Sequence, residues 1–522
     1  MSTINTEHAG RIGILVVDLG AQYAQLIARR VREAQVWSEI APPQTAVERA
    51  KSFDCRGIIL SGGPASVYAA DAPEVPSELL ELGIPVLGIC YGMQWMAREL
   101  GGEVTAADSR EFGRTSLTVG RAEAIFDGLS GHTIVWMSHG DSVTSLPAGF
   151  EVLAHTDHCP LAAIGDKQRG FYGIQFHPEV THSVRGREVL DNFVHVVCKL
   201  EPSWNSDNIV EMETEKVLAQ VGETGEVILG LSGGVDSSVA AVILHKALGD
   251  RLHCIFVDNG LLRHGERESV EETFGRSFQM DLTVVDAGPR FLEKLAGVTD
   301  PERKRKIIGY EFVEVFREEA KRFTSANFLG QGTLYPDVIE SVAAHGGSTA
   351  VIKSHHNVGG LPEDLELGLV EPLRELFKDE VRAIGRSLKV PDEIVDRQPF
   401  PGPGLAVRIL GEVTEERCTL LRAADRIVRE EIEGAGAHEG LWQYFAVLLP
   451  VKSVGVMGDA RTYESTCALR IVESEDAMTA DWSYLPQELL ARISNRIINE
   501  VRGINRVVLD ITSKPPGTIE WE

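Results

Sequence analysis

The sequence alternates short apolar runs with amphipathic stretches, and this alternation most constrains the fold. The apolar run 12–19 precedes a helical pattern over 21–33, and the apolar runs 57–60 and 84–89 follow at similar spacing. Short runs without polar interruption are typical of strands buried on both faces, and intervening helices make such strands parallel. We therefore predict an α/β protein that begins with a doubly wound parallel sheet.

A second series of this kind starts after residues 201–208, where Pro, Ser, Asn and Asp interrupt the pattern. A helix over 209–218 and a strand over 226–231 open the second series, and the Pro- and Gly-rich residues 398–404 end it. The remaining chain is predicted to be α+β, with helices over 414–433 and 486–501 and strands over 444–449 and 507–511. The predicted domains are residues 11–203, 204–397 and 398–522.

Charge and cysteine content exclude several classes of protein. The 51 Lys and Arg residues against 77 Asp and Glu give a net charge of −26, which argues against nucleic acid as a partner. No apolar run is long enough to span a membrane, and the N-terminus has no signal-peptide pattern. The seven cysteines are scattered and never spaced Cys-x-x-Cys, so we expect free thiols and a cytoplasmic protein.

The apolar run 84–89 ends in Gly88-Ile89-Cys90-Tyr91-Gly92, the nucleophile-elbow pattern with Cys in place of Ser. The two glycines permit a sharp turn, and a helix N-terminus at that turn favours the thiolate. The backbone amide of Tyr91 is a candidate oxyanion donor, and Gly62 in the loop 61–64 is a second. The competing interpretation is that Cys90 is a small core residue between two packing glycines.

A base for this cysteine is available at His177, followed by Pro178 and Glu179. Strand alternation predicts that the side chains of His177 and Glu179 lie on the same side, so that the carboxylate orients the imidazole. The alternative is a histidine without a role. Together with Cys90 these residues resemble the triad of class I glutamine amidotransferases, and the resemblance covers nearly all of residues 11–200.

That resemblance implies a flavodoxin-like domain in which Cys90 attacks the side-chain amide of glutamine, giving a thioester and ammonia. It also implies that glutamine contacts Gln94, Ser138, His139, Gly140 and Asp141. For these positions the competing interpretation is a polar loop and an ordinary helix residue.

A second motif follows the strand 226–231, where residues 232–238 read Ser-Gly-Gly-Val-Asp-Ser-Ser before a helix predicted over 239–248. Such a loop presents backbone amides to an anion. The chain contains no Gly-Lys-Ser/Thr, so the loop is not a Walker A motif and suits AMP transfer with loss of pyrophosphate. Asp236 is a candidate Mg²⁺ contact.

The loop resembles the signature of the N-type ATP pyrophosphatases. That resemblance implies an adenine nucleotide alpha hydrolase-like fold. The ATP contacts would come from Ser232, Gly233, Gly234, Val235, Asp236, Ser237 and Ser238, and from Val257 in the strand predicted over 254–260.

Five stretches in one order (301–309, 331–337, 352–357, 399–405 and 510–522) are similar to the glutamine-hydrolysing GMP synthase family. This resemblance implies the amination of XMP to GMP through an adenylated intermediate, with glutamine, ATP and Mg²⁺, and a homodimer formed by the C-terminal domain. Lys353 would contact the ATP phosphates, although a metal site at His355 and His356 is a competing idea. XMP would contact Arg305, Gln443, Lys514, Thr518, Ile519 and Glu520.

Two other functions are compatible with some of these motifs. A glutamine-dependent NAD synthetase would carry the same Ser-Gly-Gly loop, and activity with deamido-NAD but not XMP would identify it. A regulator built on an inactive amidotransferase would show damage to the triad or to the loop, and the sequence has neither.

Overall fold

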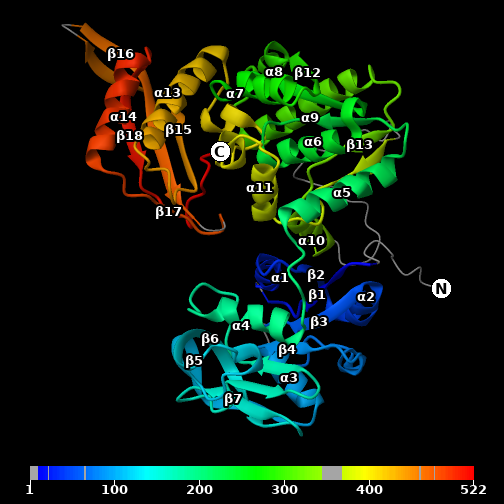
Figure 1. Ribbon diagram of the computed structural model, residues 1–522. Helices are drawn as coiled ribbons and strands as arrows, with labels where there is room; N and C mark the ends of the chain where they lie inside the picture. The colour runs from blue at the N-terminus through cyan, green and yellow to red at the C-terminus, as the bar shows by residue number, and fades with distance from the viewer. Residues whose placement is uncertain (1–9, 22, 64–65, 344–366, 458–459, 475–476) are drawn as a thin grey trace. The chain divides into compact units, whose positions relative to one another are not determined.

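The computed structural model describes residues 10–21, 23–63, 66–343, 367–457, 460–474 and 477–522 (Figure 1). The chain forms two compact units, residues 1–209 and residues 210–522. Each unit contains a sheet with a run of parallel strands. The predicted α/β class is therefore confirmed.

A nine-stranded sheet forms the centre of the first unit, in the order β2-β1-β3-β4-β9-β8-β7-β5-β6. The strands from β2 to β9 in this order are parallel, and the remaining neighbours pair antiparallel. The long pair β5·β6 had no counterpart in the sequence prediction. The strands are β1 Ile12–Val17, β2 Trp37–Ala41, β3 Asp54–Leu60, β4 Val86–Ile89, β5 Glu103–Val119, β6 Gly131–Ser145, β7 Glu151–His155, β8 Ala163–Asp166 and β9 Phe171–Ile174.

Helices cover the parallel part of this sheet, which explains why its strands are apolar throughout. Val86, Leu87 and Ile89 of β4 have no exposed surface, as expected of a strand covered on both faces. The helix after β4 is also deeply buried, from Tyr91 to Ala97. The α-helices of this unit are α1 Ala24–Glu33, α2 Ala46–Ser52, α3 Tyr91–Glu99 and α4 Gly186–Asn192. Shorter helical turns are η1 Pro43–Thr45, η2 Ser77–Glu81, η3 Ala124–Phe126 and η4 Phe193–Val197.

The second unit has a five-stranded parallel sheet in the order β12-β11-β10-β13-β14. The first strand in the chain, β10, lies in the middle, so the connections run to one side and then to the other. In such sheets ligands bind beyond the carboxyl end of the strand where the order reverses, and here that end carries the Ser-Gly-Gly loop. The strands are β10 Val227–Gly230, β11 Leu252–Asp258, β12 Asp281–Asp286, β13 Phe328–Gly330 and β14 Gly368–Val370.

The helix after the Ser-Gly-Gly loop begins at Val235, not at Val239 as predicted. The polar residues Asp236, Ser237 and Ser238 suggested a longer loop, but they form the first turn behind the N-cap Gly234. The helices of this region are α5 Ser206–Val221, α6 Val235–Leu248, α7 Glu266–Val270, α8 Gly288–Leu295, α9 Pro301–Ala320, α10 Tyr335–Ala343, α11 Lys378–Ser387 and α12 Asp392–Val395. Shorter turns are η5 Gly249–Arg251, η6 Glu271–Ser277 and η7 Gly404–Arg408.

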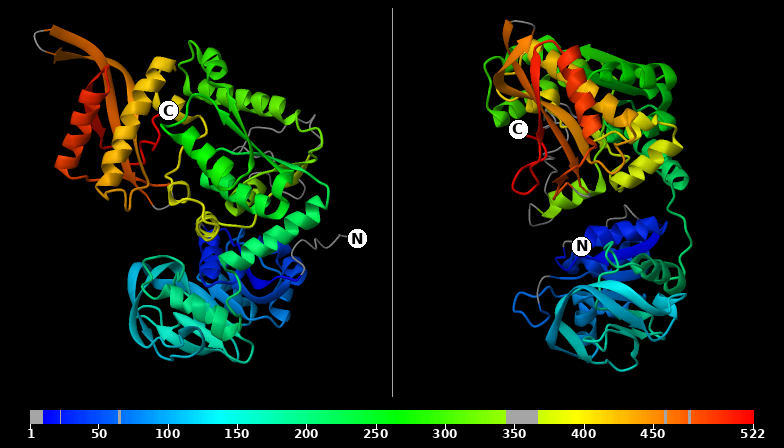
Figure 2. Two further views of the ribbon diagram at one scale, coloured as in Figure 1. Left: turned by 45° about the horizontal axis from the view of Figure 1, so that its top comes forward. Right: turned by 90° about the vertical axis from the view of Figure 1, so that its left-hand side faces the viewer.

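The C-terminal part is α+β, as predicted. Strands β15 Gln443–Met457, β16 Ala460–Glu473 and β17 Asp481–Trp482 pair antiparallel, and β18 Ile504–Asp510 pairs parallel with β16. Helices α13 Glu415–Gly434 and α14 Gln487–Glu500 lie side by side on one face of this sheet (Figure 2). Ile228 of β10 belongs to the same hydrophobic cluster as Leu421 of α13 and Ile497 of α14. The C-terminal part and the five-stranded sheet therefore share one core.

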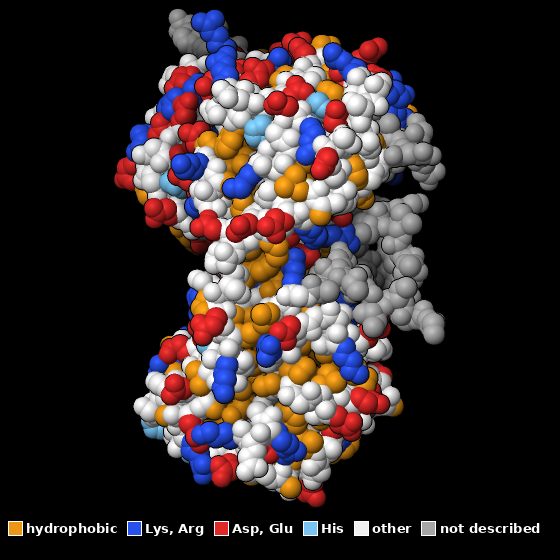
Figure 3. Space-filling model, turned by 45° about the vertical axis from the view of Figure 1, so that its right-hand side comes forward, with side chains coloured by type: hydrophobic (Ala, Val, Ile, Leu, Met, Phe, Trp, Pro, Cys, Tyr) orange, Lys and Arg blue, Asp and Glu red, His pale blue; other side chains and the backbone are white. Residues whose placement is uncertain are grey.

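On the face of the protein seen in Figure 3, basic and acidic side chains are interspersed. Of the described helices, none is long and apolar enough to cross a bilayer.

Candidate active sites

Cys90 occupies a sharp turn between β4 and α3. Its φ of 51° is positive, a conformation that few non-glycine residues adopt and that is found at strained functional turns. The glycines on either side permit this turn. A Cβ atom at Gly88 would lie 2.6 Å from the backbone nitrogen of Met93, and one at Gly92 would collide with the carbonyl of Leu60. The structure therefore has the elbow that the motif predicts.

His177 and Glu179 form a buried pair next to Cys90. The Nδ1 atom of His177 lies 2.8 Å from Oε1 of Glu179, and both residues are less than a tenth exposed. Burial lowers the pKa of His177, but hydrogen bonds with Cys90 and Glu179 outweigh burial and raise that pKa to about 10. This arrangement favours an imidazolium ion beside the cysteine sulfur.

Strand alternation was the wrong reason for this pairing. β9 ends at Ile174, so His177 and Glu179 lie beyond the strand. The hydroxyl of Ser183 donates to the carbonyl of His177 at 2.5 Å, and Nε of Arg30 donates to the carbonyl of Glu179 at 3.0 Å. These contacts fix the turn that brings the two side chains together.

The expected oxyanion donors lie against this pair. A Cβ atom at Gly62 would lie 3.1 Å from Cε1 of His177 and 3.9 Å from Cβ of Cys90, so this glycine packs against both residues. The backbone of Tyr91 opens α3 directly after Cys90. The expected loop 61–64 is described only to Gly63, because Pro64 lies outside the described residues.

Ser138, His139, Gly140 and Asp141 belong to strand β6 and not to a loop. The carbonyl of Ser138 lies 3.7 Å from Sγ of Cys90, which brings this segment to the nucleophile. Nε2 of Gln94 donates to the carbonyl of Asp141 at 2.8 Å. The strand edge, rather than a polar loop, therefore forms this wall of the site.

Gln175 was missed by the sequence analysis. Its side chain has no exposed surface, and its Nε2 lies 3.5 Å from Sγ of Cys90 while its Oε1 accepts from Gln94 at 3.2 Å. A lone glutamine after an apolar strand was the available signal, because a buried amide needs polar partners.

Glu111 is a second residue that the sequence analysis missed. Its Oε2 lies 3.4 Å from Nε2 of the buried His139, and its Oε1 accepts from the hydroxyl of Thr156 at 2.8 Å. Within the described residues Glu111, His139 and Cys159 are close enough to share a metal ion. However, burial raises the pKa of the Cys159 thiol to about 12, and the carboxylate is already hydrogen-bonded, so the group fits a structural support for β6 better.

Hydrogen bonds between its own residues hold the Ser-Gly-Gly loop in shape. The hydroxyls of Ser232 and Ser237 lie 2.9 Å apart, and that of Ser237 donates to the carbonyl of Gly234 at 3.1 Å. Gly233 has a φ of +74°, which favours glycine at that position. A pocket of about 120 Å³ opens above the loop. It is lined by Ser232, Gly234, Asp236, Ser237, Phe312, Phe316, Leu329, Gln331 and Gly332, among others.

Val235 and Ser238 begin the helix behind this pocket, and Val257 is buried near the end of the adjacent strand β11. The loop and the end of β11 therefore lie at the same edge of the sheet. Lys353, with His355 and His356, lies outside the described residues.

Asp236 has the donor atoms that a divalent cation needs. Its Oδ2 pairs with Nζ of Lys378 at 2.5 Å, whereas its Oδ1 is buried and has no hydrogen-bond partner. A free carboxylate oxygen beside a phosphate-binding loop fits Mg²⁺, which prefers oxygen ligands and keeps several waters or phosphate oxygens. Lys378 is 142 residues from Asp236 in the chain, so no local pattern predicted it.

Of the residues expected to bind XMP, Lys514, Thr518, Ile519 and Glu520 belong to the C-terminal tail, and Arg305 contacts its last residue. Nη2 of Arg305 donates to the carbonyl of Glu522 at 2.6 Å, and Nζ of Lys514 donates to the carbonyl of Ala477 at 2.7 Å. Nε2 of Gln443 donates to the carbonyl of Pro399 at 2.7 Å. Each of these polar groups is therefore held by a contact within the protein.

The last residues of the tail are fixed by buried arginines that the sequence analysis did not single out. Arg408 pairs with Glu520 at 2.8 Å, and Arg470 donates to the carbonyls of Thr518 at 3.1 Å and Ile519 at 3.3 Å. Neither arginine has exposed surface. The tail is thus bound to the body of the unit along its length.

Comparisons with known proteins cover both units. The family described as Glutamine amidotransferase class-I matches residues 15–197, NAD synthase matches residues 208–289, and GMP synthase C terminal domain matches residues 430–521. The glutamine-hydrolyzing GMP synthase of Brachyspira hyodysenteriae is 59% identical over 98% of this chain and 99% of its own. Those of Synechococcus sp. and Thermomicrobium roseum are 56% and 58% identical over 98% of this chain and 96% of theirs. The similarity extends over the whole chain and is not confined to one domain.

Proposed function

The chain belongs to the family of glutamine-hydrolysing GMP synthases, and from this we infer that it aminates XMP to GMP at the cost of ATP. XMP, ATP, glutamine and water give GMP, AMP, pyrophosphate and glutamate. The observation that carries the inference is a complete nucleophile, base and carboxylate in one unit and a pyrophosphate-type loop in the other. AMP release from ATP, with XMP and ammonia as the only other substrates, tests it.

For the glutaminase reaction we propose that Sγ of Cys90 attacks the side-chain amide carbon of glutamine. The hydrogen bonds of His177 to Cys90 and Glu179 raise the pKa of His177 to about 10 and so support an imidazolium ion beside the sulfur. The imidazolium then gives its proton to the leaving ammonia, and the sulfur keeps a glutamyl thioester. His177 next removes a proton from water, which attacks the thioester and releases glutamate.

The negative oxygen that forms in each step needs hydrogen-bond donors. The backbone amide of Tyr91 and the glycine loop at Gly62 are the proposed donors, since Tyr91 directly follows Cys90 and Gly62 packs against Cys90 and His177. Ser138, His139, Gly140, Asp141 and Gln94 are the proposed glutamine contacts, supported by the 3.7 Å approach of the Ser138 carbonyl to Cys90.

In the second unit, the oxygen at C2 of XMP attacks the α-phosphorus of ATP and pyrophosphate leaves. Ammonia then adds at C2, and AMP departs with that oxygen. Activation is needed because an oxo group is a poor leaving group. The proposed ATP contacts are the loop residues 232–238, with Val257 and Lys353, and the pocket of about 120 Å³ above the loop supports this assignment.

Mg²⁺ is the proposed cofactor, held through the free Oδ1 of Asp236. When bound it would neutralise charge on the phosphates and on the leaving pyrophosphate. Lys378 would hold the other oxygen of Asp236 in place. The proposed XMP contacts are Arg305, Gln443, Lys514, Thr518, Ile519 and Glu520, with Arg408 as the group that orients Glu520.

The match to NAD synthase favours a second candidate, a glutamine-dependent NAD synthetase. That match covers the loop and the strands around it, which both enzyme classes need, whereas the GMP synthase match lies in the C-terminal part. The two candidates differ in one assay. AMP release with deamido-NAD, and none with XMP, would identify the NAD synthetase.

A homodimer is proposed for the C-terminal part. Strands β15 and β16 expose Val454, Val456 and Tyr463 by half of their surface or more, and such an apolar patch suits an interface between two copies. Sedimentation velocity of the wild type and of Val456→Glu tests the proposal. A wild-type monomer, or a variant that stays dimeric, would contradict it.

The cytoplasm is the proposed location. All seven cysteines are free thiols, which fits a reducing compartment. Fractionation of cells, followed by detection of the protein with an antibody, tests this proposal.

A further inference from the structure

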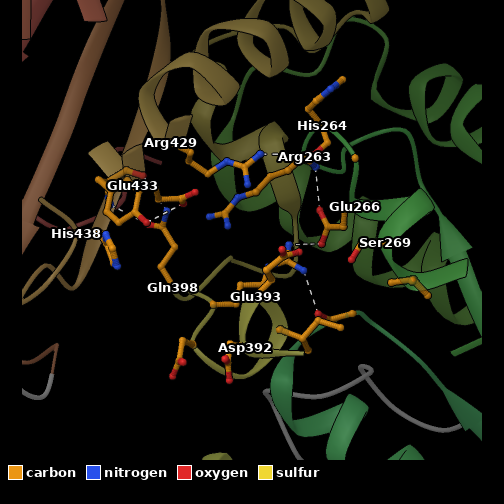
Figure 4. Close-up of a pocket in the computed structure, with 17 residues that line it drawn as sticks. Arg263, His264, Glu266, Ser269, Asp392, Glu393, Gln398, Arg429, Glu433 and His438 are labelled. Atoms are coloured by element: carbon orange, nitrogen blue, oxygen red, sulfur yellow. Dashed lines mark hydrogen bonds and ion pairs between the residues drawn. The ribbon is translucent and has the colours of Figure 1, made fainter. Parts of the chain in front are cut away.

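A second pocket of the nucleotide-binding unit borders the Ser-Gly-Gly loop at Gly233 (Figure 4). Its volume is about 510 Å³, enough for a small organic ligand. Its walls come from the segment after β11, from residues 392–398, from α13 and from the start of β15. Gly233 is the one expected ATP contact in its lining, and none of the expected XMP contacts lines it. The pocket therefore adjoins the proposed ATP site at Gly233 and contains none of the proposed XMP contacts.

Arg263 brings a buried guanidinium group with free donors to this pocket. The residue is 4% exposed, and its Nε and Nη2 atoms have no hydrogen-bond partner. Its guanidinium lies 4.2 Å from the centre of the Phe400 ring, and its Nε lies 4.0 Å from Oδ2 of Asp425. Burial lowers the pKa of Arg263 to about 9, and the charge of Asp425 offsets only part of this effect. A buried arginine with unused donors is costly unless an anion completes its surroundings.

The nearby carboxylate does not serve Arg263 alone. Asp425 also lies 3.4 Å from Nε of Arg429 and 4.0 Å from Nη1 of Arg408. Its Oδ1 accepts from the backbone amide of Ala446. In Figure 4 the side chains of Arg263 and Arg429 extend toward the same space. Three guanidinium groups thus share one carboxylate on this side of the pocket.

Several other charged groups in and around the pocket have partners of their own. Glu266 pairs with Arg397, Glu433 accepts from the hydroxyl of Tyr444 at 2.9 Å, and Arg408 also pairs with Glu520. Asp392 and Glu393 lie on the opposite wall (Figure 4). Of the arginines that line the pocket, Arg263 has two buried donor atoms without a hydrogen-bond partner, and Arg429 has one, its Nε.

We propose that this pocket binds a single phosphate group on Arg263 and Arg429, either as inorganic phosphate or as a nucleoside monophosphate. The planar fork of a guanidinium matches two phosphate oxygens, and a phosphate oxygen can accept from the Arg263 donors that have no partner. The acidic side chains on the opposite wall disfavour a long polyphosphate chain. The volume leaves room for a nucleoside beside the phosphate.

Three contacts in series connect the site to the Ser-Gly-Gly loop. Nη1 of Arg397 donates to the carbonyl of Gly233 at 3.0 Å, and Arg397 pairs with Glu266. The other oxygen of Glu266 accepts from the backbone amide of Arg263 at 2.9 Å. A phosphate on Arg263 therefore lies next to the groups that support the loop.

The test is calorimetric titration of the full chain with inorganic phosphate, and in a second arm with AMP. Saturating Mg²⁺, XMP and an ATP analogue with a methylene bridge between the α- and β-phosphates fill the substrate sites and prevent turnover. The expected result is one saturable site per chain in at least one arm. The arm that binds more tightly identifies free phosphate or the monophosphate as the source.

Arg263→Gln and Arg429→Gln should each weaken this binding about tenfold or more, since each removes a charged hydrogen bond to the anion. Arg426→Gln is the matched control, because Arg426 lies on the same helix but pairs with Glu430 at 2.7 Å. If Arg263→Gln does not fold, Arg429→Gln decides, since its side chain is 24% exposed. No saturable binding in either arm, or unchanged affinity in the Arg429 variant, would overturn the proposal.

Discussion

Replacing Glu179 by Gln perturbs the glutaminase site at one atom pair, the 2.8 Å contact with Nδ1 of His177. A hydrogen bond to a charged group is worth about 1.5–3 kcal/mol, which corresponds to roughly 10- to 150-fold in rate. The amide of Gln can also donate to Nδ1, and this leaves the proton of a neutral imidazole on Nε2. A ring in that form cannot accept the thiol proton of Cys90. In another catalytic triad the same change of tautomer lowers kcat roughly 10⁴-fold.

Glutamine hydrolysis by Glu179→Gln should therefore fall by about 10²- to 10⁴-fold, measured as glutamate release. GMP formation from added ammonium salts should stay at the wild-type rate. Glu188→Gln is the matched control, because Glu188 pairs with Arg185 on the surface of the same unit. The activity is compared as kcat/KM, which reports the binding of the transition state. A Glu179→Gln variant whose glutaminase kcat/KM stays within threefold of the wild type would refute the reasoning.

The same contact predicts a pH dependence of stability. The folded-state pKa of His177 is raised from 6.5 to about 10, so the stabilisation is complete below pH 6.5 and is lost progressively as the pH rises to about 10. The difference in unfolding free energy between the wild type and Glu179→Gln should therefore be largest near pH 6 and smallest above pH 10. Urea denaturation at several pH values measures it. A difference that grows with pH would contradict the assigned direction.

The structure predicts the effect of three other substitutions on activity or stability. Asp236→Asn should stop GMP formation from glutamine and from ammonia alike, while glutaminase activity remains; synthesis at the wild-type rate would exclude Asp236 from the ATP site. Glu520→Ala leaves the fully buried Arg408 without its 2.8 Å partner and should cost about 3 kcal/mol of unfolding free energy, measured in urea. An unchanged denaturation midpoint would contradict this. Gly88→Ala forces a Cβ to 2.6 Å from the Met93 nitrogen and should cost about 1–3 kcal/mol, seen as a lower Tm with reduced glutaminase activity.

Local sequence is sufficient to predict a site where the geometry of a turn requires a particular residue type. The glycines around Cys90 and the Ser-Gly-Gly loop were found because sharp turns and positive φ angles select glycine at fixed positions. The alternation of apolar runs likewise gave the parallel sheets, because strands covered on both faces have no polar side. Helix boundaries are harder to predict from local sequence, because the polar first turn of α6 has the composition of a loop.

Partners far apart in the chain were beyond such reasoning. Asp236 meets Lys378, Arg408 meets Glu520, and Glu111 meets His139 only because the sheets and the tail bring them together. A basic or acidic residue in isolation is typical of a solvated surface, so the sequence offered no reason to single out Lys378 or Arg408. Gln175 and Arg263 are recognisable only once burial shows that their polar groups need partners.

The division of labour between the two units is tested most directly with Cys90→Ala. The measurement is AMP release from ATP in the presence of XMP and Mg²⁺, with either glutamine or ammonium chloride as the nitrogen source. The variant should release no AMP coupled to GMP formation with glutamine, yet match the wild type with ammonium. Loss of both activities in a folded variant, or synthesis with glutamine at the wild-type rate, would contradict the account.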